Sequence, residues 1–395
     1  MAIKKQKKTV VIVLDEFITS GITTFIHSYS RYLLSTGLEV VLIGKSKNES
    51  WIAQKFHGCT LYTFSETKTT NLLGEKLATY IQSFFWYAKV FRKVRLKHSI
   101  LAVHFNQVLS AFGILLFSPS VYKYKRIYTF HGDRAHELKS EHIQHPIRTL
   151  HIAVMKHLQN FVFQRCSTVV AVSLYGLKRL RELRAPNSRY IPNGILVDTT
   201  DTGNIKKERK LQHMQYHCIN ISRFEPRKGH ILFLNAISQL LQKDVHIQTT
   251  IAGPVSSGLL PILYEYERLK LTSHIQFCYQ PDTETQEIIF RTADLFIMPS
   301  IELENCPFTI IESLARGVPV IGTPVGGIPE MLEKIDARLI AKQATPEALA
   351  RTIKWYLQLP ASKKQKIQIA CKITARTYYN AAINYKKYVR LYREK

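Results

Sequence analysis

An alternation of short apolar runs with longer segments of helical character constrains the fold of this chain more than any other feature. The apolar runs have the length of β-strands, and helical segments lie between most of them. The strands predicted in the first half are Thr9–Leu14, Glu39–Ile43, Thr60–Phe64, Ile100–Phe105, Arg126–Phe130, Thr168–Val172 and Arg189–Ile191. This pattern predicts a parallel sheet that is covered by helices on both faces and binds ligands beyond the carboxyl ends of its strands.

A polar stretch at Asp198–Lys210 interrupts the pattern, which then restarts. The strands predicted after it are Cys218–Ser222, Ile247–Ala252, Ile275–Cys278, Leu295–Met298 and Val318–Gly322. A chain of 395 residues is too long for one ordinary hydrophobic core. We therefore predict an α/β protein with two doubly wound, Rossmann-like domains, residues 1–197 and 211–374, that face a cleft. Residues 198–210 are the predicted linker, and residues 375–395 are predicted to form a helix that crosses back to the N-terminal domain.

The excess of positive charge limits the classes of partner that the protein can bind. The formal net charge is +26, from 55 Lys and Arg against 29 Asp and Glu. Such an excess attracts nucleic acid, anionic lipid headgroups or phosphate-rich substrates, and does not choose among them. The six cysteines are scattered without a Cys-x-x-Cys pair, which suggests a reducing compartment. The apolar run after the lysine-rich residues 1–8 is too short for a signal peptide, so we expect a cytoplasmic protein without a transmembrane helix.

Two basic residues flank the loop that follows the first strand of the second half. Arg223 stands at the end of that strand, and Lys228 stands just before the next helix. Arginine offers a planar fork to phosphate oxygens and lysine a mobile point charge, so the pair suits a diphosphate. Two solvated residues in an ordinary basic loop are the alternative interpretation.

Two glutamates and a glycine turn follow further along the chain. Glu304 and Glu312 are separated by seven residues, with a helix predicted to start near Pro307. Carboxylates so placed can accept hydrogen bonds from the hydroxyl groups of two sugars, although both can also be ordinary acids near a helix start. The amides of the turn that contains Gly326, Gly327 and Ile328 can hold an anion.

Taken together, these elements resemble family 4 of the retaining glycosyltransferases, the glycosyl transferases group 1, which have the GT-B fold. The resemblance spans nearly the whole chain and is sharpest over residues 219–330. It implies that Arg223 and Lys228 bind the diphosphate of a nucleotide sugar, that Glu304 contacts its sugar ring and that Glu312 holds its ribose. The other residues that it places around this co-substrate are Asn305, Cys306, Pro307, Gly326, Gly327 and Ile328.

The first half holds two further matches to the family. Gly21 lies between the first strand and a helix, where the family usually has two glycines, and is predicted to bring the backbone close to the sugar donor. His131 follows the strand Arg126–Phe130 and resembles the family's loop beside the reacting bond. The predicted catalytic residues are thus His131, Arg223, Lys228 and Glu304. A structural role for the lone histidine stays open.

The resemblance also implies a type of chemistry and a set of partners. We expect transfer of a hexose-type sugar with retention of configuration, from a UDP-sugar or alternatively a GDP-sugar. The expected acceptor is a glycan or lipid-linked glycan in surface polysaccharide or lipopolysaccharide synthesis. The chain has no Asp-x-Asp motif, so no metal and no other cofactor are expected.

Residues 84–97 combine aromatic side chains with a basic cluster. On a helix, they can rest on an anionic membrane surface, so we expect peripheral binding at the inner face of the cytoplasmic membrane. A stripe that faces the core is the alternative. Nucleic acid is not an expected partner, because no recognition motif is present. The competing functions are a sugar-nucleotide epimerase of similar fold and a non-catalytic polyanion-binding protein.

Overall fold

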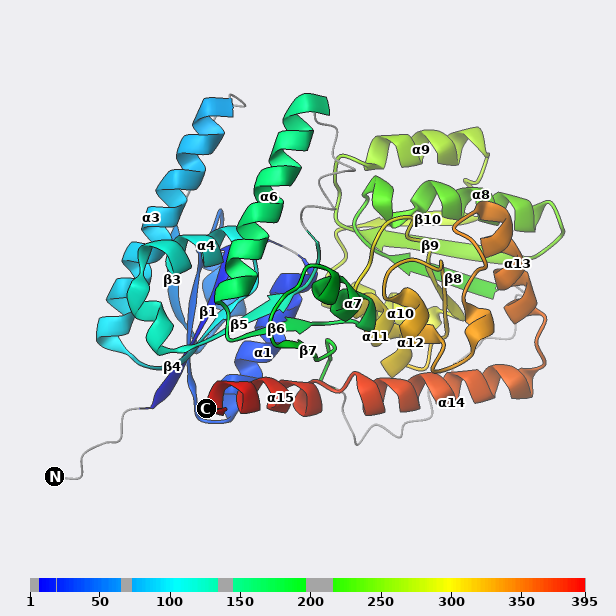
Figure 1. Cartoon of the computed structure of the whole chain (residues 1–395). Coiled ribbons are helices and arrows are strands. Elements are labelled where there is room, and N and C mark those ends of the chain that lie inside the picture. Colours follow the sequence, from blue (N-terminus) through cyan, green and yellow to red (C-terminus); the bar gives the residue numbers. More distant parts are fainter. Residues whose placement is uncertain (1–6, 19, 65–72, 134–144, 197–215, 395) are drawn as a thin grey trace. The chain divides into compact units, whose positions relative to one another are not determined.

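The computed structural model describes residues 7–18, 20–64, 73–133, 145–196 and 216–394 (Figure 1). It divides into two compact units, Met1–Pro192 with Ala381–Lys395, and Asn193–Asn380. The predicted linker, residues 198–210, lies outside the described residues.

The first unit is built on a parallel sheet of seven strands in the order β3-β2-β1-β4-β5-β6-β7. All seven predicted strands are present: β1 (Lys8–Glu16), β2 (Glu39–Lys45), β3 (Thr60–Phe64), β4 (Ser99–Phe105), β5 (Lys125–Phe130), β6 (Thr168–Ala171) and β7 (Ser188–Tyr190). Its helices before the second unit are α1 (Gly21–Ser35), α2 (Glu49–Lys55), α3 (Leu73–Lys97), α4 (Val108–Phe117), α6 (His145–Arg165) and α7 (Leu174–Glu182). The chain winds outward from β1 to β3 and then starts again at β4, so the order reverses between β1 and β4.

The second unit repeats this plan with five parallel strands in the order β10-β9-β8-β11-β12. The predicted strands appear as β8 (Tyr216–Ile221), β9 (Ile247–Gly253), β10 (Ile275–Tyr279), β11 (Leu295–Met298) and β12 (Val320–Gly322). The helices are α8 (His230–Leu241), α9 (Leu259–Arg268), α10 (Thr283–Thr292), α11 (Phe308–Ala315), α12 (Ile328–Leu332), α13 (Pro346–Leu357) and α14 (Ala361–Tyr378). Here the strand order reverses between β8 and β11. None of the described helices of the chain is both long and apolar enough to cross a membrane.

The burial of the strands explains why apolar runs rather than alternating patterns mark them. Val10–Leu14 of β1 and Leu295–Met298 of β11 are buried along their whole length. A central strand of a parallel sheet is covered by helices on both faces, so every side chain faces an apolar layer. Some of the helices between the strands begin at side-chain caps, such as Ser20 on α1 and Asp282 on α10.

The C-terminal region differs from the prediction of one helix over residues 375–395. Helix α14 ends at Tyr378 in the second unit, and a separate helix, α15 (Ala381–Arg393), belongs to the first unit. The backbone between them is extended, because Asn380 forms a parallel bridge with Ile195 and the Ile195 amide donates to the carbonyl of Tyr379. This pairing interrupts the helix at the boundary between the two units.

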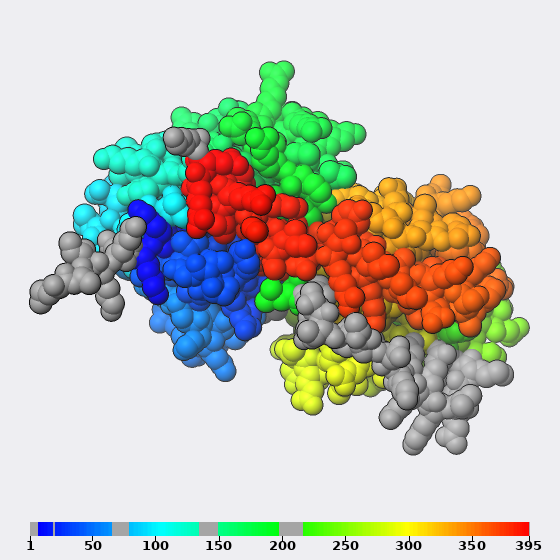
Figure 2. Space-filling model, turned by 90° about the horizontal axis from the view of Figure 1, so that it is seen from below, coloured from blue at the N-terminus to red at the C-terminus, as the bar shows by residue number. Residues whose placement is uncertain are grey.

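Helix α15 joins the first unit through buried tyrosines. In Figure 2 the last residues of the chain, in red, lie against the blue residues of the first unit. The hydroxyl of Tyr29 on α1 donates to Tyr392 at 2.7 Å, and the Tyr392 hydroxyl lies 2.6 Å from Nδ1 of His104 on β4. Nε2 of His104 lies 2.7 Å from Oγ1 of Thr129 on β5, which in turn contacts the hydroxyl of Tyr388. We call these five residues the tyrosine–histidine network.

The network predicts how stability depends on pH. Burial lowers the pKa of His104 to about 3, far below its ordinary value, so the folded ring stays neutral at pH values where the unfolded ring takes up a proton. Stability is therefore lost as pH falls from about 6.5 towards 3, at about 1.4 kcal/mol per pH unit for one histidine. Denaturant unfolding at pH 7, 6 and 5 measures this slope, and His104→Asn is expected to reduce it by one histidine's share. An unfolding free energy that is constant between pH 7 and pH 5 would contradict the prediction.

Candidate functional site

Most of the residues predicted from the second half lie on loops that follow three adjacent strands. Strand β8 has β11 as its neighbour, and β11 has β12 on its other side. The loop after β8 carries Arg223 and Lys228, the loop after β11 carries Glu304, and the turn after β12 carries Gly326 and Gly327. Because parallel strands end at the same edge of the sheet, these loops meet where the strand order reverses.

The Arg223–Gly229 loop holds its two arginines on a shared carboxylate. One guanidinium nitrogen of Arg223 lies 2.9 Å from Oε1 of Glu225, and Nε of Arg227 donates to the other carboxylate oxygen at 2.8 Å. The side chains of both arginines are partly exposed. A guanidinium has five N–H donors in a planar fork, which is the geometry that suits a phosphate.

Lys228 and Glu304 form a buried ion pair between the loops after β8 and β11. The Lys228 ammonium donates to Oε1 of Glu304, and the same oxygen accepts from the Ser300 hydroxyl at 3.2 Å and lies 3.8 Å from the Arg227 guanidinium. Burial alone would raise the pKa of Glu304, but the charges of Lys228 and Arg227 hold this pKa below its ordinary value. The carboxylate is therefore ionised at neutral pH.

Two glycines allow these loops to approach so closely. Gly229 has φ +71°, and a Cβ atom there would lie 1.9 Å from the carbonyl oxygen of Pro299. Gly326 has φ +57°, and a Cβ atom there would lie 2.0 Å from the carbonyl oxygen of Glu304. Neither position accepts a side chain without moving the backbone, so both glycines serve the placement of Lys228 and Glu304.

The turn after β12 differs from the predicted anion cradle. The amide of Gly327 donates to the carbonyl of Glu304 at 2.6 Å, and the amide of Ile328 donates to the carbonyl of Val325 at 3.2 Å. Two of the three predicted amides are thus bonded within the chain. What the turn does in this structure is fix the backbone of Glu304.

Glu312 lies where the sequence predicted it, in the second turn of α11, whose first residue follows Pro307. Burial raises the pKa of its carboxyl group, and the charge of Arg316 only partly offsets this effect. Among the described residues, none donates a hydrogen bond to this carboxylate. In the preceding loop, burial raises the pKa of the Cys306 thiol to about 12, and its carbonyl accepts a hydrogen bond from Asn193 at 2.9 Å. Cys306 therefore contributes backbone geometry rather than a reactive thiol.

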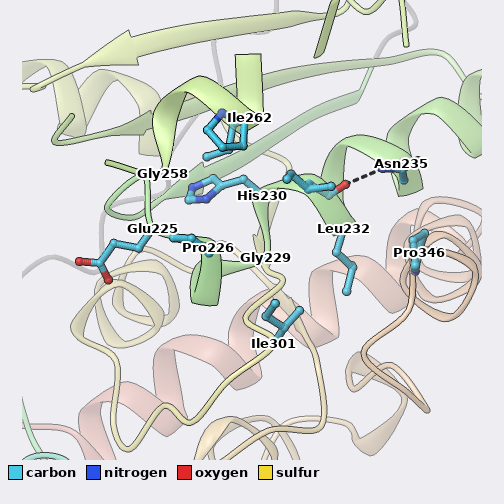
Figure 3. A pocket seen from close by; sticks show the side chains of 12 residues that line it. Glu225, Pro226, Gly229, His230, Leu232, Asn235, Gly258, Ile262, Ile301 and Pro346 are labelled. Carbon is cyan, nitrogen blue, oxygen red and sulfur yellow. Dashed lines mark hydrogen bonds between the residues drawn. The ribbon is translucent and has the colours of Figure 1, made fainter. Parts of the chain in front are cut away.

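A pocket of about 380 Å³ lies behind the Arg223–Gly229 loop, against α8 and α9 (Figure 3). Glu225, Gly229, His230 and Ile262 are among its lining residues. Arg223, Lys228 and Glu304 do not line it. The mainly apolar pocket therefore only borders, through Glu225, the charged cluster that consists of Arg223, Glu225, Arg227, Lys228 and Glu304. Nε2 of His230 lies 3.1 Å from the hydroxyl of Ser222, the residue directly before Arg223, so this contact ties the start of α8 to the start of the loop.

His131 and Gly21 belong to the first unit. Gly21 is the first residue of α1, directly after the cap Ser20, and His131 follows β5. Nε2 of His131 lies 3.1 Å from Oδ1 of Asn106, and its ring packs against Phe25 with centroids 5.0 Å apart. Burial lowers the pKa of His131 to about 3, so the ring is neutral and can take part in hydrogen bonds without carrying charge.

No role was predicted for Glu225, Arg227, Ser300 or Asn106. Glu225 and Arg227 lie in the same loop as Arg223 and Lys228. The alternation of charges there, Arg-x-Glu-x-Arg-Lys, already indicated ion pairs within the loop. Ser300 follows the buried strand β11, and Asn106 follows the buried strand β4. A polar residue at the carboxyl end of a parallel strand is a candidate site residue, so the sequence held a signal for these two as well. Among the described residues, no group of three or more His, Cys, Asp or Glu is placed to hold a metal ion.

Comparison with protein families gives two matches that follow one another along the chain. The model described as Glycosyltransferase Family 4 matches residues 19–199, and the one described as Glycosyl transferases group 1 matches residues 201–372. One relative is the putative colanic acid biosynthesis glycosyltransferase WcaL of Escherichia coli (strain K12). It is 24% identical, and the alignment covers 50% of this chain and 49% of the WcaL chain. A phosphatidyl-myo-inositol mannosyltransferase of Mycobacterium leprae is 24% identical over 60% of this chain and 67% of its own. The chain thus spans about half of the first of these relatives and two thirds of the second.

Solved structures share the fold over almost the full length. Sucrose-phosphate synthase from Thermosynechococcus elongatus has a TM-score of 0.80 at 16% identity, covering 98% of both chains. Anabaena HepE in complex with UDP and glucose has a TM-score of 0.74 at 17% identity, covering 97% of this chain and 98% of its own. WaaG, a glycosyltransferase involved in lipopolysaccharide biosynthesis, has a TM-score of 0.70 at 14% identity, covering 97% and 99%. With both halves matched by family models and the two-sheet fold in place, the chain belongs to the family 4, group 1 glycosyltransferases of GT-B fold.

Proposed function

We propose that this protein is a retaining, metal-independent glycosyltransferase that moves a hexose-type sugar from a nucleotide diphosphate sugar to a glycan or lipid-linked glycan. The observation that carries the proposal is the meeting of Arg223, Arg227, Lys228 and Glu304 where the second sheet reverses its strand order. A UDP-sugar is the favoured donor and a GDP-sugar the alternative, and the UDP bound to the HepE neighbour supports the first. The names of the E. coli relative and of WaaG support a place in surface polysaccharide or lipopolysaccharide synthesis.

The charged cluster suits the chemistry of this reaction. Transfer breaks the bond between C1 of the sugar and the diphosphate oxygen, so negative charge grows on the β-phosphate. Fixed positive groups that point at this developing charge stabilise the transition state and contribute strongly to catalysis. Arg223 and Lys228 supply this charge in our proposal, in the place that a metal ion takes in transferases with an Asp-x-Asp motif. We assign Glu312 to the ribose and Glu304 to the sugar hydroxyls.

Retention is proposed to follow a front-face path, in which the leaving phosphate accepts the proton of the acceptor hydroxyl. A double displacement would need a carboxylate nucleophile, and Glu304 is engaged with Lys228 and Ser300. We assign His131 of the first unit to a hydrogen bond with the sugar donor. Its neutral ring, held by Asn106, suits that role rather than one as a charged acid.

Turnover of a panel of nucleotide sugars tests the proposed function. The protein is incubated with UDP- and GDP-sugars, with and without a lipid-linked glycan acceptor and with and without EDTA. We expect acceptor-dependent release of the nucleoside diphosphate that EDTA does not reduce, and an α-linked product from an α-linked donor by NMR. Interconversion of the nucleotide sugars without acceptor would instead identify an epimerase. Inhibition by EDTA would contradict the proposal that the enzyme works without a metal ion.

We further propose that the first unit binds an anionic membrane surface from the cytoplasmic side through α3. One face of this helix packs into the core, because Tyr87, Phe91 and Val94 are buried. Around the remaining surface winds a stripe of exposed residues spaced by four, which turns by about 40° at each step. It consists of Ile81, Phe85, Lys89, Lys93 and Lys97. The buried face is the core-facing stripe of the alternative interpretation, and the exposed side chains are the ones that we propose for membrane contact. The stripe joins apolar side chains to lysines, which is the pattern of helices that lie at a membrane surface.

Binding to liposomes is expected to depend on this stripe. Each lysine near an anionic surface contributes about 1 kcal/mol, so replacing Lys89, Lys93 and Lys97 with glutamine should weaken partitioning by roughly 100-fold. Sedimentation with phosphatidylglycerol vesicles at low and high salt measures the effect. The matched control replaces exposed lysines of the second unit, Lys270, Lys363 and Lys366, and should change partitioning little. Equal losses in the two triple variants would mean that overall charge, rather than α3, drives binding.

A further inference from the structure

The charges around the Arg223–Gly229 loop nearly balance one another. Arg223, Arg227 and Lys228 are positive, and Glu225 and Glu304 are negative. Glu225 pairs with both arginines, and Glu304 pairs with Lys228. The surplus is one positive charge, although the site is proposed to hold a diphosphate. A ligand phosphate must therefore compete with the protein's own carboxylates for these cations.

The pair between Lys228 and Glu304 is the most buried of these contacts. The two side chains are 12% and 10% exposed, whereas those of Arg223 and Arg227 are 35% and 24% exposed. Glu304 is fixed from two sides, since Ser300 donates to its carboxylate and Gly327 to its carbonyl. The lysine ammonium is a compact charge on a flexible stem, so Lys228 is the partner that can turn to another anion.

We propose that the Lys228–Glu304 ion pair is the resting state of the sugar-donor site and makes this site prefer an intact nucleotide sugar over the nucleoside diphosphate left after transfer. The inference rests on the proposed function and gives the pair a role in selecting the ligand. An incoming diphosphate draws Lys228 away from Glu304. When the sugar is present, its hydroxyl groups replace the ammonium as hydrogen-bond donors to the carboxylate.

A nucleoside diphosphate without a sugar offers no such replacement. Its phosphates take Lys228, and the buried Glu304 carboxylate keeps only Ser300 and the more distant Arg227. Leaving a buried charge without its partner is costly, so this complex is weakened. After transfer the carboxylate regains Lys228, which loosens the hold on the spent nucleotide and favours its release. If the pair instead stays intact in every state, the arginines alone bind the diphosphate and Glu304 has no influence of this kind.

Titration calorimetry with the full chain separates these two possibilities. UDP, GDP and ADP are titrated into the wild type, and the tightest of them and its glucose conjugate are compared in Glu304→Gln. We expect this variant to bind the nucleoside diphosphate at least about tenfold more tightly than the wild type, equivalent to about 1.4 kcal/mol. The preference for the glucose conjugate over the diphosphate should shrink by at least the same factor.

Two further variants separate the effect of the ion pair from a general effect of charge. Glu304→Asp keeps the charge but shortens the side chain, so it should shift the diphosphate affinity in the same direction by less. Glu302→Gln removes a negative charge from the same loop without touching the pair, and should leave the affinity within about twofold of the wild type. If the wild type binds a nucleoside diphosphate and both Glu304 variants bind it equally or more weakly, the inference is wrong and the proposed function stands. If the wild type binds none of the three, the proposed function itself fails, and the inference with it.

Discussion

Replacing Lys228 with alanine is expected to lower kcat by about 100- to 1000-fold, the loss typical of removing one group that stabilises transition-state charge. Lys228 is one of the three cations of the cluster and the one that lies deepest. Its loss also leaves Glu304 buried beside the leaving diphosphate, where like charges repel. Both effects act on the step in which negative charge grows, so kcat should fall more than KM rises.

Steady-state turnover with the best donor of the nucleotide-sugar panel measures this loss. The matched control is Lys243→Ala, because Lys243 is exposed beyond the end of α8 and outside the charged cluster. Its kcat should equal that of the wild type. A Lys228→Ala enzyme that keeps kcat within about threefold would contradict the role of this lysine in charge stabilisation.

Replacing Tyr392 with alanine is expected to lower the free energy of unfolding of the first unit by about 3–5 kcal/mol, as for other large buried rings. Tyr392 is fully enclosed and connects α15 to α1 and β4 through Tyr29 and His104. Tyr392→Phe keeps the ring but removes the hydroxyl between these two polar groups. Its expected cost is about 1–3 kcal/mol, because the partners stay buried.

Urea unfolding of the full chain at pH 7.5 measures both changes, followed by a probe in the first unit because the two units can unfold separately. Tyr264→Ala is the control, since this tyrosine of α9 is 74% exposed and its loss should cost less than about 0.5 kcal/mol. If Tyr392→Ala costs no more than Tyr264→Ala, helix α15 is not held by the tyrosine–histidine network.

The fold could be predicted well from the sequence because each strand is a buried apolar run with its own boundaries. Strands Thr60–Phe64 and Leu295–Met298 match the prediction residue for residue, and the others differ by a few residues at their ends. The break between α14 and α15 was missed, although Asn380 is a residue type that often follows the end of a helix. Its cause is the backbone pairing with Ile195, which lies far away in the sequence.

The candidate site could be predicted as a list of residues and only in part as an arrangement. The resemblance to a family singled out Arg223, Lys228 and Glu304, and the strand order brings their loops together. The direct contact between Lys228 and Glu304 depends on how closely two loops approach each other. Gly229 and Gly326 allow this approach, because each packs against a carbonyl group that is far away in the sequence. For the same reason the turn at Gly327 and Ile328 was predicted as an anion cradle, whereas its amides bind carbonyls of the chain itself.

Thermal stabilisation by nucleotides tests most directly the claim that the charged cluster of the second unit is a nucleoside diphosphate site. The wild type, Arg223→Ala and Glu312→Ala are each heated with UDP, GDP, ADP and CMP. A ligand at 100 times its Kd adds about 2.7 kcal/mol to the stability of the folded state. We predict that one nucleoside diphosphate raises the Tm of the wild type and of neither variant. If no nucleotide stabilises the wild type, and a polyanion such as nucleic acid does so instead, the account of this cluster is contradicted.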